Sequence, residues 1–153
     1  MFFNKKAKKK QSLVKHFSIW FRNSSAGVRH EWLDDSKKRS WVLAYFNGSL
    51  DCMIQSYGLE DDRTELILTT LGSLYGIDMF SGEVWKFNDE EMIQFLTRCA
   101  DQTKPEFERL SVEETAFLLA GGKNCLKWLK ESDDKYCAYL PVKIYEYIEE
   151  EKF

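Results

Sequence analysis

The chain has 153 residues, of which 44% are hydrophobic and 15% aromatic. That composition excludes an intrinsically disordered chain, and a single domain of this length buries roughly 68–70% of its unfolded surface. With only two prolines and eight glycines, the chain lacks the frequent turns that an all-β sandwich needs.

The charge is divided unevenly along the chain. Residues 1–40 carry 11 Lys or Arg and three Asp or Glu, a net charge of +8, whereas the rest carry 11 against 22, a net charge of −11. Summed charge governs association rather than fold. The uneven charge is therefore the main clue to partners: it favours a basic partner for the acidic part, with an anionic partner for the basic part as the alternative.

The cysteines and the lengths of the apolar runs indicate the cellular location of the protein. Cys52, Cys99, Cys125 and Cys137 stand singly, so no pair has the spacing of metal ligands. No secretory signal is recognisable, and the longest apolar run, Trp41–Phe46, is far shorter than the roughly 20 residues of a membrane span. We expect a cytoplasmic protein with reduced thiols and no transmembrane segment.

The amino-terminal region divides at residue 11. Residues 1–11 carry five lysines and little to bury, which predicts a flexible basic arm. From residue 12 the apolar residues follow a helical period, which predicts an amphipathic helix that ends near residues 23–25. Its apolar face consists of Leu13, Phe17, Trp20 and Phe21.

The next segment supplies the expected centre of the domain. A short helix is predicted over residues 28–35, and Asp34, Asp35 and Ser36 offer an N-cap for a helix over residues 37–57. The middle of that helix is apolar nearly all round, as in helices buried at the centre of a domain.

Three later helices are predicted from their first turns. In each, a polar cap residue precedes a Glu by three positions, the arrangement of a capping box or a looser relative of it. The pairs are Asp62 with Glu65, Asn88 with Glu91, and Ser111 with Glu114. They predict helices over residues 62–76, 89–101 and 112–120.

The remaining segments are punctuated by glycine and proline. Gly121 and Gly122 are expected to end the helix over residues 112–120, and residues 124–131 to form a further short helix. Pro141 suits the first turn of a last helix that runs into the acidic end. Small β elements are candidates over residues 77–87, as a hairpin, and over residues 136–140.

These patterns predict an all-α fold. We expect a single compact domain of roughly six to eight helices over residues 12–153, after the flexible arm of residues 1–11. The domain is expected to pack around residues 41–57 and 64–76.

No catalytic, cofactor or metal motif is recognisable. His30 and Asp34 share a helical face, but no second pair of metal ligands follows at a matching spacing. Gly121, Gly122 and Lys123 lack the remainder of a phosphate-binding loop. We expect a protein that is not an enzyme, with no cofactor and no metal; a small hydrolase or transferase around His30 is the enzymatic alternative.

The function predicted first is that of a non-enzymatic protein-binding module. An acidic surface with aromatic anchors would bind a protein partner with a basic surface. The candidate residues are Asp61, Asp62, Asp89, Glu90, Asp133, Asp134, Glu149 and Glu150. A toxin-neutralising protein of the immunity type has this size and charge character, which is an analogy of composition alone.

The alternative is a peripheral binder of nucleic acid or of an anionic membrane. Residues 1–22 form a basic amphipathic segment, and such segments contact phosphates or lie on anionic membranes. The candidate residues are Lys8, Lys9, Lys10, Lys15, Trp20 and Arg22. The sequence leaves the partner's identity and the oligomeric state open.

Overall fold

A computed structural model describes residues 2–74, 89–100 and 109–151. These residues form six α-helices and three short 3-10 helices, with no β-strand among them, so the predicted all-α class is confirmed. In chain order the elements are α1 (Phe2–Ser25), η1 (His30–Asp34), α2 (Ser36–Ser56), η2 (Glu60–Asp62), α3 (Arg63–Leu74), α4 (Asp89–Ala100), α5 (Val112–Glu131), η4 (Asp134–Ala138) and α6 (Tyr139–Glu151).

The two β predictions have different outcomes. The hairpin predicted over residues 77–87 lies outside the described residues. The candidate over residues 136–140 is wrong, because these residues end η4 and begin α6. Tyr136 and Tyr139 are half-buried against the core from these helical elements, so the aromatic pattern came from packing rather than from a strand.

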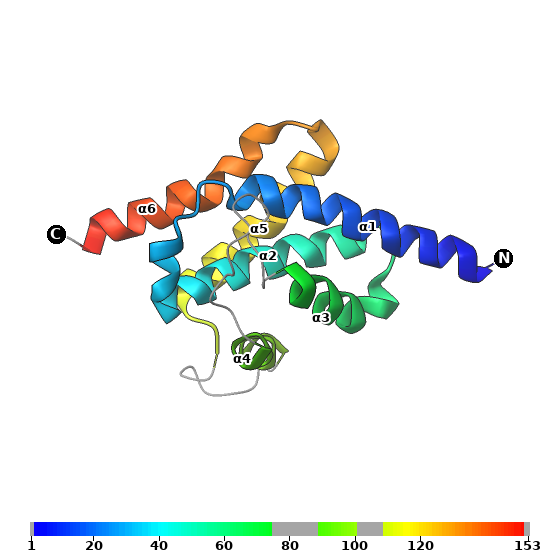
Figure 1. The fold of residues 1–153 in the computed structure, drawn as a ribbon, viewed down its shortest axis with the longest axis horizontal. Helices are drawn as coiled ribbons and strands as arrows, with labels where there is room; N and C mark the ends of the chain where they lie inside the picture. The colour runs from blue at the N-terminus through cyan, green and yellow to red at the C-terminus, as the bar shows by residue number, and fades with distance from the viewer. Residues whose placement is uncertain (1, 75–88, 101–108, 152–153) are drawn as a thin grey trace.

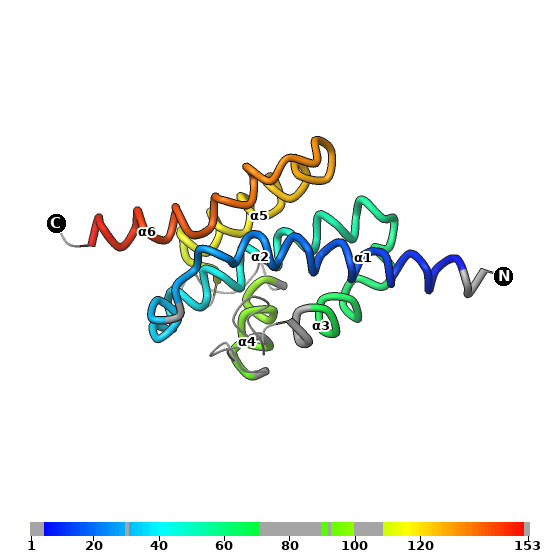
Figure 2. The backbone as a smooth tube through the Cα atoms, turned by 45° about the horizontal axis from the view of Figure 1, so that its top comes forward, coloured from blue at the N-terminus to red at the C-terminus, as the bar shows by residue number. Residues whose placement is uncertain are grey.

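Helix α2 is the centre of the molecule. Figures 1 and 2 show it passing through the middle, with α1, α3 and α5 around it. Every residue from Trp41 to Leu50 is buried. This confirms the prediction that an apolar helix in this region forms the core, and α2 begins one residue before the predicted start at residue 37.

Helix α5 is continuous where a break was predicted at Gly121 and Gly122. The two helices α2 and α5 approach so closely that a Cβ atom on Gly121 would lie 1.9 Å from the Tyr45 carbonyl oxygen. A Cβ atom on Gly48 of α2 would lie equally close, 1.9 Å from the Leu118 carbonyl oxygen. The glycines therefore serve contact with a neighbouring helix, and the intrahelical hydrogen bonds of α5 continue through them.

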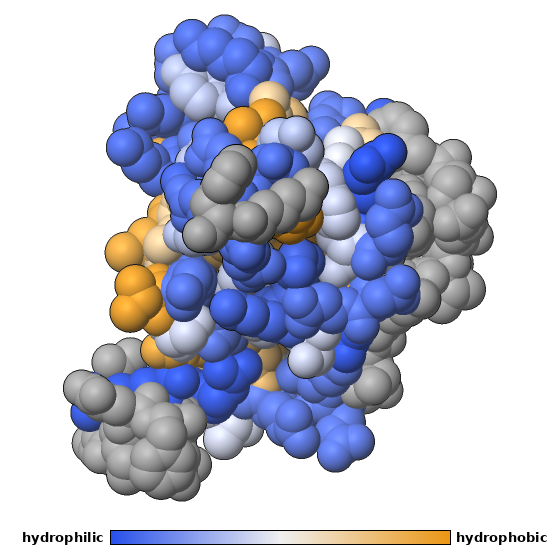
Figure 3. Space-filling model, turned by 90° about the vertical axis from the view of Figure 1, so that its left-hand side faces the viewer, coloured by the Kyte–Doolittle hydropathy of each residue, from blue (hydrophilic) through white to orange (hydrophobic). Residues whose placement is uncertain are grey.

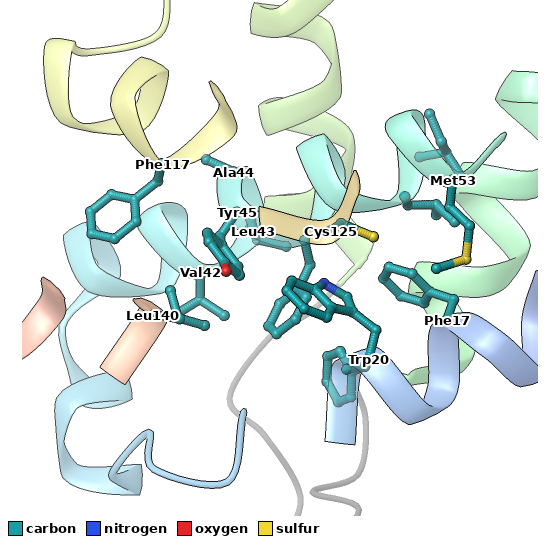
Figure 4. Packing of buried hydrophobic residues seen from close by; sticks show 14 of the residues in the cluster. Phe17, Trp20, Val42, Leu43, Ala44, Tyr45, Met53, Phe117, Cys125 and Leu140 are labelled. Carbon is teal, nitrogen blue, oxygen red and sulfur yellow. The ribbon is translucent and has the colours of Figure 1, made fainter. Parts of the chain in front are cut away.

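Helix α1 covers one side of this centre with its apolar face. Leu13, Phe17, Trp20 and Phe21 are fully buried. Figure 4 shows Phe17 and Trp20 pointing from α1 towards side chains of α2 and α5, and the ring centroids of Trp20 and Trp128 lie 5.3 Å apart. The amphipathic helix predicted from residue 12 is thus present as a core element.

The basic segment before residue 12 continues α1 without interruption. Its contact with the domain is ionic, since Lys6 Nζ lies 2.7 Å from Asp62 Oδ2 and Lys10 Nζ lies 3.4 Å from Glu65 Oε2. The structure therefore shows residues 2–11 as helical turns, where the sequence predicts a separate arm. Asp62, expected to cap α3, turns instead towards these lysines.

Helix α4 is attached by two ion pairs and one buried ring. Arg39 of α2 donates to Glu91 at 2.8 and 3.0 Å. Arg98 of α4 donates to both carboxylate oxygens of Glu114 at 2.7 and 2.9 Å. Phe95 is 1% exposed between them, so apolar burial and charge together hold α4 against α2 and α5.

Candidate protein-binding surface

A hollow of about 390 Å³ lies where η1, the start of α2 and the end of α6 meet. Its lining consists of Glu31, Trp32, Asp34, Asp35, Lys38 and Ile148. These elements lie at the end of the molecule that contains the C-terminus, at the left of Figure 1. An aromatic and an aliphatic side chain thus lie among three carboxylates and one ammonium group, an arrangement we call the acidic hollow.

The cap of α2 fixes one wall of the acidic hollow. Asp35 accepts a hydrogen bond from the backbone amide of Lys37 at 2.8 Å, which is the N-cap predicted from the sequence. Lys38 Nζ donates to the other oxygen of Asp35 at 2.8 Å. This bond is the main reason why the pKa of Asp35 lies below its usual range, and Asp35 is therefore charged at neutral pH.

The floor of the acidic hollow belongs to the core. Trp32 and Ile148 are half-buried and pack against the central hydrophobic cluster, so each presents only part of its surface. Trp32 lies in the single turn η1, between Arg29 and the start of α2. A half-buried aromatic side chain that is rigidly supported from below is typical of interface anchors.

The rim carries charges of both signs. The Glu31 side chain is 67% exposed and lies 3.5 Å from Arg29 Nε. Glu151, in the last turn of α6, lies 4.0 Å from the ammonium groups of Lys37 and Lys38. This end of the molecule has a largely hydrophilic surface, with hydrophobic side chains gathered mainly at the left of the view in Figure 3.

The predicted acidic residues are not gathered on one surface. Asp61 and Asp62 lie in η2, and Asp89 and Glu90 begin α4. Asp133 is the N-cap of η4, Asp134 is its first residue, and Glu149 and Glu150 lie in the last turn of α6. Only Glu149 and Glu150 adjoin the acidic hollow in sequence, next to Ile148.

Some of the predicted carboxylates have intramolecular roles. Asp62 pairs with Lys6 and Lys10. Asp133 caps η4 through the Lys135 amide, and Asp134 accepts a hydrogen bond from Trp128 Nε1 at 3.1 Å. Of Asp89 the structure describes only the backbone.

Sequence reasoning missed Glu31 and Trp32 as part of a surface. It assigned residues 28–35 to a helix, used Asp34 and Asp35 as caps, and considered Asp34 also as a partner of His30. The usable signal was local: an aromatic residue between carboxylates, immediately before the N-cap of the most apolar helix. The contribution of Ile148 had no local signal, because only the tertiary fold brings α6 to η1.

The predicted basic residues divide into two groups. Lys8, Lys9, Lys15 and Arg22 are exposed on α1. Lys10 is held near Asp62 and Glu65. Trp20 is fully buried, so it belongs to the core and offers no surface to a partner.

The thiols and His16 lie in protected positions. All four cysteines are free, and burial raises the pKa of Cys99 and of Cys137 to about 11. His16 Nδ1 lies 3.1 Å from the Tyr57 hydroxyl, and burial lowers the pKa of His16. Within the described ranges no group of His, Cys, Asp and Glu side chains has the arrangement of a metal site.

A second, larger depression of about 670 Å³ lies between α2, α3 and α4. Its walls include Ile67 and Leu68 of α3 and Ile93 and Leu96 of α4. Asn47 of α2 lines it as well, with its amide 3.7 Å from Cys99 Sγ. Among its described lining residues Arg63 is the one that carries a charge, whereas four charged residues line the acidic hollow.

Comparisons with models of protein families, with curated proteins and with solved structures found no match for this chain. None of the helices in the described part of the chain is long and apolar enough to cross a membrane.

Proposed function

We propose that the protein is a non-enzymatic binding module that uses the acidic hollow to bind a protein with a basic surface. The observation that supports this most directly is Trp32, half-buried and rigidly backed by the core, beside Glu31, Asp34 and Asp35. Aromatic anchors with a polar rim are the usual anatomy of protein interfaces.

The chemistry of the acidic hollow selects cationic side chains. A Lys or Arg of the partner would lie over the Trp32 ring, where a cation–π contact contributes about 0.5–2 kcal/mol. The carboxylates around it would raise the association rate and exclude acidic partners. Neutralisation of a basic toxin is one biological role that fits these requirements, and a secreted toxin encoded by the adjacent gene would support it.

The experiment compares three forms of the full chain as baits in the cells that produce it. The first is the wild type, and the second, Glu31→Gln/Asp34→Asn/Glu151→Gln, removes three charges from the acidic hollow. The third, Glu60→Gln/Asp61→Asn/Glu113→Gln, removes three charges elsewhere. We expect one basic protein to be captured by the wild type and the third form and lost from the second.

The captured protein then permits a quantitative test. Trp32→Ala is expected to weaken its binding about 30-fold, the effect of losing a central anchor of about 2 kcal/mol. Circular dichroism checks that the variant remains folded. An acidic partner, or equal losses for both charge variants, would contradict the proposal.

A further inference from the structure

Helix α1 carries a second charged surface that the acidic hollow does not involve. Its 24 residues, Phe2–Ser25, include six lysines and one arginine and no Asp or Glu. In Figures 1 and 2 it runs along the outside of the molecule, and its amino-terminal turns extend beyond the neighbouring helices. This position leaves one side of a uniformly basic helix facing solvent.

The basic residues of α1 fall into two groups on different sides of the helix. Lys6 and Lys10 face η2 and α3, where they pair with Asp62 and Glu65. The exposed group makes no ion pair with any residue that the structure describes. It consists of Lys5, Lys8, Lys9, Lys15 and Arg22, which we call the basic face.

The geometry of the basic face is regular. Lys8, Lys15 and Arg22 follow one another at intervals of seven residues, which is close to two helical turns. The three side chains therefore start from nearly one line along the helix, about 10 Å apart. Lys5 and Lys9 both lie to one side of this line at its amino-terminal end, about 60° and 100° around the helix from Lys8.

This arrangement of charges destabilises helix α1 itself. Lysines in the first turns lie at the positive end of the helix dipole, and Lys5 repels Lys8 and Lys9 at spacings of three and four residues. Asp62 and Glu65 compensate only the lysines on the other side. Within the described protein no ion pair compensates the charges of the basic face, which favours an extended anion as its ligand.

We propose that the basic face binds the phosphodiester backbone of double-stranded nucleic acid, without regard to sequence. A line of cations on a rigid helix complements the regular phosphates of a duplex, and each phosphate neutralised releases counterions. The acidic carboxylates of η2 lie beside Lys6 and Lys10, away from the Lys8 and Lys15 side of the helix.

Two observations favour a duplex over other anionic ligands. The apolar face of α1 is buried in the core, so the helix cannot insert that face into lipid as membrane-surface helices do. Among the side chains of α1 that the structure describes, residues 5–25, the large exposed apolar ones are Val14 and Ile19, at 36% and 43%, and neither is aromatic. Within residues 5–25, stacking of unpaired bases, the usual mode for single strands, therefore has no platform on α1.

The test measures binding of the full chain to a labelled DNA duplex of about 30 base pairs by fluorescence anisotropy over a range of salt concentrations. If all five cations neutralise phosphates, the plot of log K against log salt has a slope of about −4.5. The variant Lys8→Gln/Lys15→Gln/Arg22→Gln is expected to reduce the slope to about −2.

A second variant with the same net charge provides the control. Lys37→Gln/Lys123→Gln/Lys143→Gln removes three cations from α2, α5 and α6, and we expect it to retain the wild-type slope. Equal effects of the two variants, or no binding at low salt, would overturn the proposal. Binding to phosphatidylserine vesicles in place of the duplex, or tighter binding to a single strand of the same length, would overturn it as well.

Discussion

Gly121 shows how one residue determines the contact between the two central helices. The Gly121 Cα atom lies against the Tyr45 carbonyl, and Ser49 Oγ donates to the Gly121 carbonyl oxygen at 3.1 Å. The same hydroxyl proton is shared with the Tyr45 carbonyl oxygen, which lies 2.8 Å from Ser49 Oγ. The hydroxyl thus bridges two backbone carbonyls at the closest approach of α2 and α5, where there is no room for a further carbon atom.

We therefore expect Gly121→Ala to lower the free energy of unfolding by about 2–3 kcal/mol, the upper range for overpacking a core. The added Cβ would lie 1.9 Å from a backbone oxygen, so the helices must separate. Gly122→Ala is the matched control, because its Cβ would lie 3.3 Å from the nearest atom. Urea denaturation of both variants measures the difference; equal stabilities would contradict the close contact.

His16 makes the stability of the folded protein depend on pH. It lies against the Trp128 ring, with centroids 4.9 Å apart, and contacts the Tyr57 hydroxyl. Burial lowers its pKa below the ordinary 6.5. The unfolded chain therefore takes up a proton at a higher pH than the folded protein, so stability is lost as the pH falls through 6.5.

We expect the urea concentration at the unfolding midpoint of the wild type to decrease as the pH is lowered from about 7.5 to about 5.5. Most carboxylates titrate below this range. In His16→Gln, which keeps a hydrogen-bonding side chain beside Tyr57, this part of the pH dependence should be smaller. A wild type and a variant with identical pH profiles over this range would show that His16 titrates alike in the folded and unfolded states.

At the scale of elements, Glu114 joins the start of α5 to α4. In the capping box, the Glu114 carboxylate accepts a hydrogen bond from the Ser111 backbone amide at 3.0 Å. The same carboxylate accepts both hydrogen bonds from the Arg98 guanidinium. Its side chain is only 5% exposed. A helix cap and an interhelical ion pair therefore share one carboxylate.

Substitutions at the capping box separate these two roles. Glu114→Gln keeps an acceptor for the Ser111 amide but loses the charge, and we expect it to destabilise the protein by about 1–2 kcal/mol. Ser111→Ala removes the cap alone, at about 1 kcal/mol. Glu114→Ala loses both roles and should exceed either, as measured by urea denaturation. If Glu114→Gln proves as stable as the wild type, the ion pair to α4 contributes nothing.

The same elements show how far sequence can predict this fold. The capping box at Ser111 and the N-cap at Asp35 were predictable, because each involves residues within three positions of one another. The continuity of α5 through Gly121 was not, because a glycine that ends a helix and one that admits a neighbouring helix look alike locally. The acidic hollow escaped prediction for the same reason, since Ile148 reaches it only through the tertiary fold.

At the scale of the whole molecule, the uneven charge of the sequence becomes two separate surfaces. The basic face runs along α1 from Lys5 to Arg22, and the acidic hollow lies near the C-terminal end of α6, at the end of the molecule opposite the N-terminus in Figure 1. Fixed charges interact across water over a Debye length of about 8 Å at physiological salt. The two surfaces should therefore act independently there and influence one another only at low salt.

This independence gives a prediction that separates local from overall charge. Glu31→Gln/Asp34→Asn/Glu151→Gln brings the formal net charge from −3 to zero, yet we expect it to change duplex affinity by less than about threefold at physiological salt and to leave the salt slope unaltered. At low salt its affinity should rise above the wild type, because like-charge repulsion is then less screened. If duplex affinity instead follows net charge at every salt concentration, whichever surface is altered, the basic face is not a discrete binding site.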